Sequence, residues 1–332
     1  MRVVAATLLL ALAGCATVEP VATYTNPVLR SDFPDPAVLR APDGWYYAYA
    51  TQGAPSGRLL NVQVARSADL VRWEHLGDAL PRRPAWAAAK QQFWAPHVIH
   101  DAERARYVMY YSAEPDAARG KCLAVAVSAG PAGPFTDIGA PLLCGEGIEH
   151  IDPMAFDDPR SGRRLLYWGS GRLPIRVREL APDRLAFAPG SQIADLLHAD
   201  DARPYRSLIE AAWVTYRDGW YYLFFSGDRC CVGERRYAVM VARSRSATGP
   251  FEEQEAPLLE ASRPWLAPGH CAVVADGSGA DWMLYHAIDT RASPNDRLML
   301  LDRVEYADGW PRVRGASSEP QPAPRAGPTA LR

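Results

Sequence analysis

Several features that would point to other classes of protein are missing from this 332-residue sequence. The 36 basic and 38 acidic residues nearly balance, at a formal net charge of −2, and no basic stripe indicates a nucleic-acid partner. No Cys-x-x-Cys spacing suggests a metal site. The apolar stretch from Val3 to Ala13 is too short to cross a bilayer. No segment has a convincing helical periodicity, which favours an all-β fold.

One short pattern, a head residue followed by an apolar run, recurs at nearly equal intervals. Four of the heads are titratable, and a fifth copy has alanine in this place: Asp35, Ala95, Asp152, Glu210 and His270. The steps between successive heads are 60, 57, 58 and 60 residues. Such a period is typical of a circular or stacked array of one supersecondary unit.

Each repeat continues with segments that are typical of strands. Aromatic or aliphatic runs follow the heads at residues 45–49, 107–111, 165–168, 220–225 and 282–285. Alternating apolar runs come next at residues 62–65, 123–127, 175–177, 238–242 and 298–301. Several repeats end in a small-residue turn and a last short strand. Five repeats of four short strands predict a single domain, a five-bladed β-propeller of four-stranded blades.

The predicted fold gathers the head residues. The first strand of a propeller blade lines the central channel, so equivalent heads from different blades converge on the axis. Three carboxyls and one imidazole are therefore expected to face one another across a central pocket. Asp35-Pro36 and Asp152-Pro153 could each be only a turn dipeptide. Carboxyls in three repeats of the same pattern favour a catalytic site.

The N-terminal segment predicts export. Arg2 and the apolar stretch after it indicate a secretory signal, and the stretch ends in Leu12-Ala13-Gly14-Cys15, which resembles a bacterial lipobox. The resemblance implies cleavage before Cys15 and lipidation of that residue, which would hold the protein in the bacterial cell envelope, in the outer membrane or periplasm or at the cell surface. An ordinary signal peptide with an incidental cysteine is the alternative.

The expected organisation has four parts. They are a lipoprotein signal peptide at 1–14, a lipidated tether at 15–25, the propeller at 26–314 and a disordered proline-rich tail at 315–332. Five cysteines remain after Cys15, so at least one thiol stays free within the chain. Cys122 and Cys144 are the preferred disulfide because they fall in adjacent strands of the second blade. The adjacent Cys230 and Cys231 could include a partner for Cys271.

With the repeat in place, the chain resembles glycoside hydrolase family 43, whose members are five-bladed propellers that cleave arabinose- and xylose-containing polysaccharides. The resemblance runs from about residue 26 to residue 314. The motifs that carry it are Asn26-Pro27-Val28, Phe33-Pro34-Asp35-Pro36, Phe93-Trp94-Ala95-Pro96, Ile151-Asp152-Pro153, Ile209-Glu210-Ala211 and Pro268-Gly269-His270. The segment 224–233 is most similar to the arabinanase and arabinofuranosidase branches.

The resemblance implies an inverting hydrolase of α-L-arabinofuranosyl or β-D-xylosyl linkages in arabinan or arabinoxylan. It makes Asp35 the general base, Glu210 the general acid, and Asp152 the residue that orients Glu210 and raises its pKa. Inversion places the base and acid roughly 6.5–9.5 Å apart, so that a water molecule fits between base and sugar. Side chains from different blades of a narrow channel can meet that distance.

Other substrate contacts are expected around these carboxyls, at Trp94, His97, Phe33, His270 and Arg291. Trp94 is expected to stack on a pentose, with a purely structural core aromatic as the less favoured alternative. His270 would lie near the channel centre beside a bound water or one structural calcium ion, or else make a structural hydrogen bond. No cofactor is required for the expected reaction.

Three other functions stay open. A retaining propeller glycosidase of fructans would need its two carboxyls about 5–5.5 Å apart, and its Asn-Asp-Pro-Asn motif is missing. A surface lipoprotein that binds carbohydrate without cleaving it is the non-enzyme alternative, and a protein scaffold is a further one. The presence of all three carboxyls favours the hydrolase. The expected partners are an oligo- or polysaccharide and, through Cys15 alone, a membrane; the expected state is a monomer.

Overall fold

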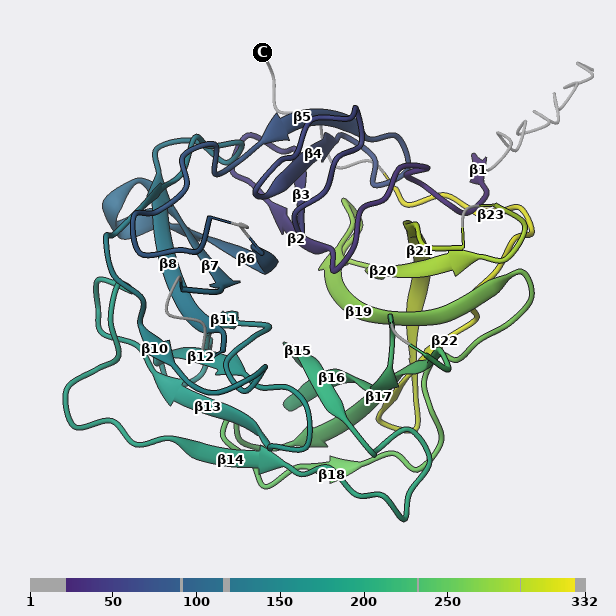
Figure 1. Ribbon diagram of the computed structural model, residues 1–332. Coiled ribbons are helices and arrows are strands. Elements are labelled where there is room, and N and C mark those ends of the chain that lie inside the picture. Colours follow the sequence, from purple (N-terminus) through teal and green to yellow (C-terminus); the bar gives the residue numbers. More distant parts are fainter. Residues whose placement is uncertain (1–21, 90–91, 116–119, 232, 293, 326–332) are drawn as a thin grey trace, which may run out of the picture.

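The chain folds into five small antiparallel sheets arranged around a central axis (Figure 1). The computed structural model describes residues 22–89, 92–115, 120–231, 233–292 and 294–325. Blade 1 consists of β2 (Ala37–Arg40), β3 (Tyr46–Ala50), β4 (Gln63–Ser67) and β5 (Glu74–Asp78). Blade 2 consists of β6 (Trp94–Asp101), β7 (Arg106–Ala113) and β8 (Cys122–Ser128), with β9 (Thr136–Asp137) and β10 (Leu143–Cys144) both paired to β8. A single 3-10 turn, η1 (Ala102–Arg104), connects β6 to β7.

The remaining blades repeat this order from the axis outward. Blade 3 consists of β11 (Met154–Asp157), β12 (Arg164–Trp168), β13 (Ile175–Glu179) and β14 (Ala194–Leu197). Blade 4 consists of β15 (Ile209–Arg217), β16 (Trp220–Arg229), β17 (Arg236–Ser244) and β18 (Glu252–Glu253). Blade 5 consists of β19 (Trp265–Ala275), β20 (Asp281–Asp289), β21 (Arg297–Ala307) and β22 (Trp310–Val313). The predicted five-bladed β-propeller is confirmed.

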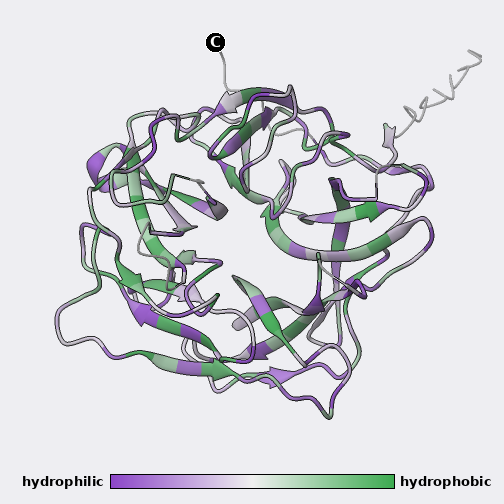
Figure 2. Cartoon of the chain, in the orientation of Figure 1, coloured by the Kyte–Doolittle hydropathy of each residue, from purple (hydrophilic) through white to green (hydrophobic). Residues whose placement is uncertain are grey.

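The middle strands form because each blade packs between two neighbouring blades. All five residues of β3 are buried, whereas the outer strand β5 of the same blade has none that is fully buried. A strand that is covered on both faces needs a continuous apolar run rather than an alternating one, which explains the aromatic segments of the sequence. Hydrophobic residues accordingly recur in the strands of every blade (Figure 2).

The two ends of the described chain meet beside blade 5. β1 (Thr23–Tyr24) pairs with β23 (Gln321–Pro322), and the side-chain amide of Gln321 donates to the buried carboxylate of Asp302 at 2.8 Å. The prediction of a disordered tail is therefore wrong for residues 315–325, as is the predicted tether for residues 23–24. A proline in a two-residue edge strand leaves no ladder hydrogen bond unmade, so the proline-rich composition does not prevent this pairing. The signal peptide, Cys15 and residues 326–332 lie outside the described residues.

The cysteines follow the prediction in part. Cys122 and Cys144 form the expected disulfide between β8 and β10. Cys230 and Cys231 are bonded to each other, so the expected pairing of Cys271 with one of them is wrong. Cys271 is a free, buried thiol on the inner strand β19, and burial raises its pKa to about 12. It therefore stays protonated and unreactive.

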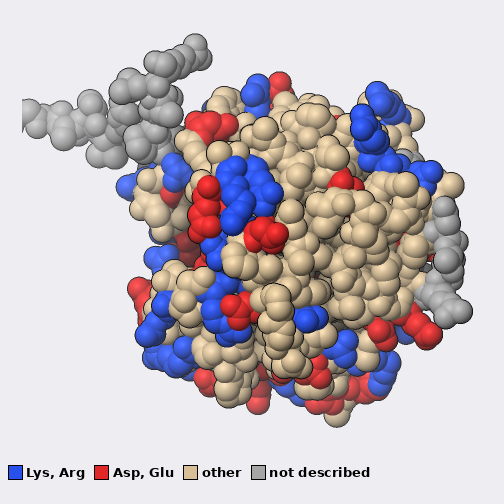
Figure 3. All heavy atoms as spheres, turned by 90° about the vertical axis from the view of Figure 1, so that its left-hand side faces the viewer, with Lys and Arg blue, Asp and Glu red and all other residues tan. Residues whose placement is uncertain are grey.

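The surface agrees with the balanced composition. On the side of the molecule at the left of Figure 1, basic and acidic side chains are interspersed (Figure 3). The part of the chain that the structure describes contains no helix able to cross a bilayer.

Candidate active site

A left-handed residue lies within or just before the channel-lining strand of every blade. The backbone φ angle is positive at Asp35 (57°), Ala95 (44°), Asp152 (59°), Ala211 (58°) and His270 (48°). This conformation costs roughly 1–2 kcal/mol for a residue with a side chain, and such strain concentrates at functional sites. In blade 4 the equivalent residue is Ala211, so Glu210 lies one residue before it. The prediction that Glu210 shares the position of Asp35 and Asp152 is thus wrong by one residue.

Side chains of the preceding blade bind the backbone N–H at these positions. The donor and acceptor pairs are Asp35 N to His286 Nδ1 (3.1 Å), Ala95 N to Thr51 Oγ1 (2.8 Å), Asp152 N to Ser112 Oγ (3.1 Å) and His270 N to Ser226 Oγ (2.8 Å). Blade 4 differs, because Ala211 N donates to the carboxylate of Asp152 at 3.1 Å. Ser170, which follows the second strand of blade 3, instead donates to the carboxylate of Glu210 at 2.7 Å. In blade 4, the Ser170 side chain from the preceding blade therefore binds the carboxylate of Glu210 instead of a backbone N–H.

The carboxylate of Asp35 is held in its ionised form. Arg297 Nη1 lies 2.7 Å from Oδ1, and the Thr51 hydroxyl donates to Oδ2 at 2.6 Å. Burial alone would raise the pKa of Asp35, but the Arg297 guanidinium and the neighbouring imidazoles bring it well below its usual range. Because burial holds the pKa of His270 at about 4, this imidazole is neutral near pH 7, and Arg297 is the cation that acts on Asp35.

Glu210 lies in the opposite electrostatic environment. Its two oxygens accept hydrogen bonds from Ser170 and from the Tyr237 hydroxyl, the latter at 2.8 Å. Burial raises the pKa of Glu210, these two hydrogen bonds oppose the rise, and the charge of Asp35 adds to it. The pKa of Glu210 is raised, as expected, but burial is the main cause and the charge that adds to it is that of Asp35, whereas the expected cause was Asp152. Gly269 makes room for Tyr237, since a Cβ atom there would lie 2.0 Å from the tyrosine ring.

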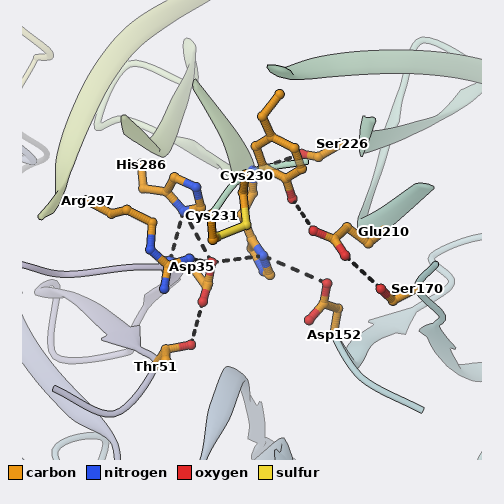
Figure 4. The surroundings of a disulfide bond; sticks show 12 residues. Asp35, Thr51, Asp152, Ser170, Glu210, Ser226, Cys230, Cys231, His286 and Arg297 are labelled. Atoms are coloured by element: carbon orange, nitrogen blue, oxygen red, sulfur yellow. Dashed lines mark hydrogen bonds and ion pairs between the residues drawn. A yellow bond between two sulfur atoms is a disulfide. The ribbon is translucent and has the colours of Figure 1, made fainter. Parts of the chain in front are cut away.

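Asp152 is buried, and its protonation is coupled to that of Glu210. Burial, and then the charges of Glu210 and Asp35, raise its pKa well above the usual range. Two neighbouring buried carboxyls of this kind titrate as a coupled pair. His270 Nδ1 lies 3.4 Å from Asp35 Oδ1 and 3.9 Å from Asp152 Oδ2, so the imidazole bridges the two aspartates (Figure 4).

The predicted calcium ion at His270 has little support in the side chains present. Calcium takes six to eight oxygen ligands. Among residues 22–325 with the gaps given above, no group of three or more His, Cys, Asp or Glu side chains is arranged to hold a metal ion. The aspartate oxygens nearest His270 already accept hydrogen bonds from Arg297 and from the backbone of Ala211. These residues do not fit a directly coordinated calcium ion.

Two of the predicted substrate contacts, Phe33 and Arg291, lie away from the carboxyls. Phe33 is fully buried and its ring packs at a steep angle against that of His75. His97 lines the small hollow on the axis, but it is buried, accepts a hydrogen bond from the backbone of Ala155 at 3.3 Å and packs against the Trp213 ring, so its contact with substrate stays a prediction. Arg291 is exposed and pairs with Asp289, so it does not reach the carboxyls.

Trp94 keeps its predicted place beside the left-handed residue Ala95. It is half-buried, and the ammonium group of Lys121 lies 3.5 Å from the centre of its ring. One face of the indole is thus covered by a cation. Stacking of a sugar on this ring stays a prediction.

The groups that shift the pKa values of the carboxyls could not be identified from the sequence. They are Thr51, Ser170, Tyr237, His286 and Arg297. All of them lie on or just after the second or third strand of a blade, where the sequence resembles ordinary core. Only Arg297 had a signal, since a cation directly before the apolar run 298–301 is unexpected on a buried strand.

The arrangement can perform acid–base chemistry. One buried carboxylate is kept ionised by a cation, while a second carboxyl on another blade has a raised pKa that favours its protonated form. Two titratable groups whose environments push their pKa values apart provide a base and an acid at the same pH. A small hollow on the axis adjoins them and is lined in part by Pro36, Ala95, Asp152, Trp213 and His270.

Comparison with known proteins agrees with this chemistry. Residues 24–311 match the family model described as Glycosyl hydrolases family 43. A curated relative is arabinan endo-1,5-alpha-L-arabinosidase C of Emericella nidulans, which is 29% identical over 82% of this chain and 89% of the relative. Another is the extracellular exo-alpha-(1->5)-L-arabinofuranosidase ArbA of Cellvibrio japonicus, 24% identical over 85% and 86% of the two chains. A solved structure of a thermostable family-43 glycoside hydrolase superposes with a TM-score of 0.78 at 28% identity, and covers 92% of this chain and 100% of its own.

Proposed function

The chain belongs to family 43 of the glycosyl hydrolases and is a glycoside hydrolase, and on that premise we propose that it cleaves α-L-arabinofuranosyl linkages in arabinan-type polysaccharides or their oligosaccharides with inversion. The substrate class is supported by the names of the curated relatives, which are arabinosidases and arabinofuranosidases. The observation that carries the mechanism is the contrast between the two carboxyls. Arg297 keeps Asp35 ionised, whereas burial raises the pKa of Glu210.

In the proposed reaction Asp35 is the general base. A water molecule between Asp35 and the sugar attacks the anomeric carbon from the face opposite the leaving oxygen, and Asp35 takes the proton that the water loses. Arg297 lowers the basicity of Asp35, so this proton moves late, when the oxygen has already begun to bond to a carbon of oxocarbenium character. The attack inverts the anomeric configuration.

Glu210 is the general acid of the same step. It donates its proton to the leaving oxygen as the bond between that oxygen and the anomeric carbon breaks. The products are a free sugar of inverted configuration and the shortened chain or alcohol. Proton exchange with solvent then returns Asp35 to its ionised form and Glu210 to its protonated form.

Asp152 acts on Glu210 through two contacts. Its carboxylate binds the N–H of Ala211, the residue that follows Glu210, and so fixes the backbone that carries the acid. Its proton equilibrium is coupled to that of Glu210, because each negative charge disfavours the other. Asp152 is therefore a positioning residue that also tunes the acid. One structural calcium ion near the channel centre stays a prediction, and no step passes through it.

The proposal includes export and lipid anchoring at Cys15, followed by a short tether to β1. Export is supported by the N-terminal pattern and by curated relatives that are described as extracellular. The enzyme would then act in the bacterial cell envelope. We propose that the enzyme is a monomer.

The test is incubation with nitrophenyl α-L-arabinofuranoside, nitrophenyl β-D-xyloside and linear arabinan, with product sizes resolved and the first-formed anomer identified by NMR. We expect hydrolysis of the arabinosyl substrates and an inverted anomer. Turnover of the xyloside alone would overturn the sugar assignment, and a retained anomer would overturn the mechanism. Sugar binding with no turnover of any substrate would show a binding protein instead.

A further inference from the structure

The disulfide between Cys230 and Cys231 does not cross-link distant parts of the chain. It joins neighbours in the sequence, whereas the bond between Cys122 and Cys144 spans 22 residues. A disulfide restricts the unfolded chain more as the closed loop grows longer, and a ring that encloses one peptide bond restricts it very little. The function of this disulfide must therefore be local.

Its position is set by the hairpin of β16 and β17. Glu210 on β15 pairs with Ser226 on β16, and β16 continues past this pair to Arg229. The disulfide follows directly, so it lies at the same end of blade 4 as the carboxyl of Glu210. Figure 4 draws the disulfide together with the residues around Asp35 and Glu210.

The disulfide packs against Tyr237, the residue that donates a hydrogen bond to the proposed general acid Glu210. Cys230 is half-buried and packs against an apolar cluster formed by Tyr237, Ala267 and Ile288. The hydroxyl of Tyr237 donates to Glu210. Cys231 is exposed, so one side of the disulfide is supported and the other is open to solvent.

The loop that carries the disulfide is also fixed to blade 5. The Arg235 guanidinium donates to the backbone oxygen of Pro294 and, at 3.0 Å, to the side-chain oxygen of Asn295. Both acceptors belong to the connection between β20 and β21. The loop therefore bridges the blade of the acid and the blade of Arg297.

We propose that the Cys230–Cys231 disulfide is a platform for the sugar unit on the leaving-group side of the scissile bond. The inference rests on the proposed function. The transferred sugar lies deepest, where Asp35 directs water to it, and the leaving oxygen meets Glu210. The rest of the substrate must then extend toward the end of blade 4, where the disulfide lies. Sulfur is polarisable and a weak hydrogen-bonding atom, so it suits the C–H face of a sugar ring.

The test measures binding in an Asp35→Asn parent, which holds substrate without cleaving it. Calorimetry compares this parent with the same protein carrying Cys230→Ser and Cys231→Ser. The probes are arabinotriose, which spans the scissile bond, and arabinose, which fills only the deep subsite. We expect the serine pair to bind arabinotriose about 5- to 20-fold more weakly, to bind arabinose within about twofold of the parent and to keep the same Tm.

The outcomes separate the platform from its alternatives. Unchanged arabinotriose affinity would overturn the platform. A parallel loss for arabinose and arabinotriose would also overturn it, since the disulfide would then act by holding Tyr237 and the deep subsite. A parent that binds neither sugar would instead refute the proposed function. Both proteins keep the Cys122–Cys144 disulfide of blade 2, so this cross-link cannot account for a difference between them.

Discussion

Nη1 of Arg297 lies 2.7 Å from Oδ1 of Asp35, which joins the last blade to the first at the centre of the ring. The pair is buried enough for the cation to act strongly, and it brings the pKa of Asp35 well below the usual range despite burial. The base of the proposed reaction is therefore ionised at any pH at which the protein would work.

Replacement of Arg297 by glutamine should move the acidic limb of the pH–rate profile. Without the guanidinium, burial dominates and raises the pKa of Asp35, so a higher pH is needed to ionise the base. We expect kcat/KM at pH 5 to fall by about 100-fold or more, with partial recovery at higher pH. Arg72→Gln, which changes an exposed arginine, is the control and should leave the profile unchanged. An acidic limb at the wild-type position in R297Q would refute this role.

The acid and the base should differ in their response to the leaving group. Asp35→Asn and Glu210→Gln should each lower turnover of arabinan by about 1,000-fold or more, because each removes a proton-transfer group. With a dinitrophenyl arabinoside, whose leaving group needs no proton, E210Q should recover most of its activity and D35N should not. Steady-state kinetics on the two substrates check this. Recovery in D35N instead of E210Q would exchange the two roles.

Tyr237→Phe should move the alkaline limb of the profile. The lost hydroxyl hydrogen bond favours the ionised form of Glu210, so its removal raises the pKa of the acid further. We expect the alkaline limb to shift upward by about one pH unit, since a hydrogen bond to a charged group contributes roughly 1.5–3 kcal/mol. The ring stacked on His286 is retained. Tyr46→Phe, which removes a hydroxyl bound to the backbone of Ala275, is the matched control. A downward shift in Y237F would contradict the assignment.

Asp302 should make the stability of the fold depend on pH. Burial raises its pKa from 3.8 to about 6, against the hydrogen bonds from Tyr285, Gln321 and Asn26. A carboxyl with a raised pKa in the folded state stabilises the protein below its unfolded pKa, and this contribution is lost as the pH rises through about 6. We expect the difference in unfolding free energy between wild type and Asp302→Asn to change by on the order of 3 kcal/mol between pH 4 and pH 7, in favour of the variant at pH 7.

Urea denaturation at the two pH values checks the role of Asp302. The exposed Asp218 provides the control, because Asp218→Asn should leave the pH dependence of stability close to that of wild type. Parallel pH dependence in D302N and wild type would show that the carboxyl does not gain a proton on folding.

The repeat in the sequence was sufficient to predict the fold and to select Asp35, Asp152 and His270. The period alone determines which strands line the channel, because every blade starts at the same point of the repeat. The offset of Glu210 does not come from an unusual strand register, because the same irregularity occurs between Trp94 and His97 in blade 2 and between Gly269 and Ala272 in blade 5. The steps of the repeat vary between 57 and 60 residues, so the repeat alone does not assign a head to one exact residue.

The partners of the carboxyls could not be predicted for a different reason. Arg297 contacts Asp35 only because blade 5 packs against blade 1, and Tyr237 contacts Glu210 across the sheet of blade 4; sequence distance carries no information about either contact. Arg291 is an expected substrate contact, yet its side chain is exposed and pairs with Asp289. A partly buried arginine at the start of an apolar strand, such as Arg297, is the better indicator, because a cation is retained there only beside a partner.

The contact between the first and last blades also has a temporal consequence. The ribosome makes Asp35 long before Arg297, and until the fifth blade docks against the first the carboxylate has no counter-charge. The proposed base thus acquires its counter-charge only when the circle of blades is completed.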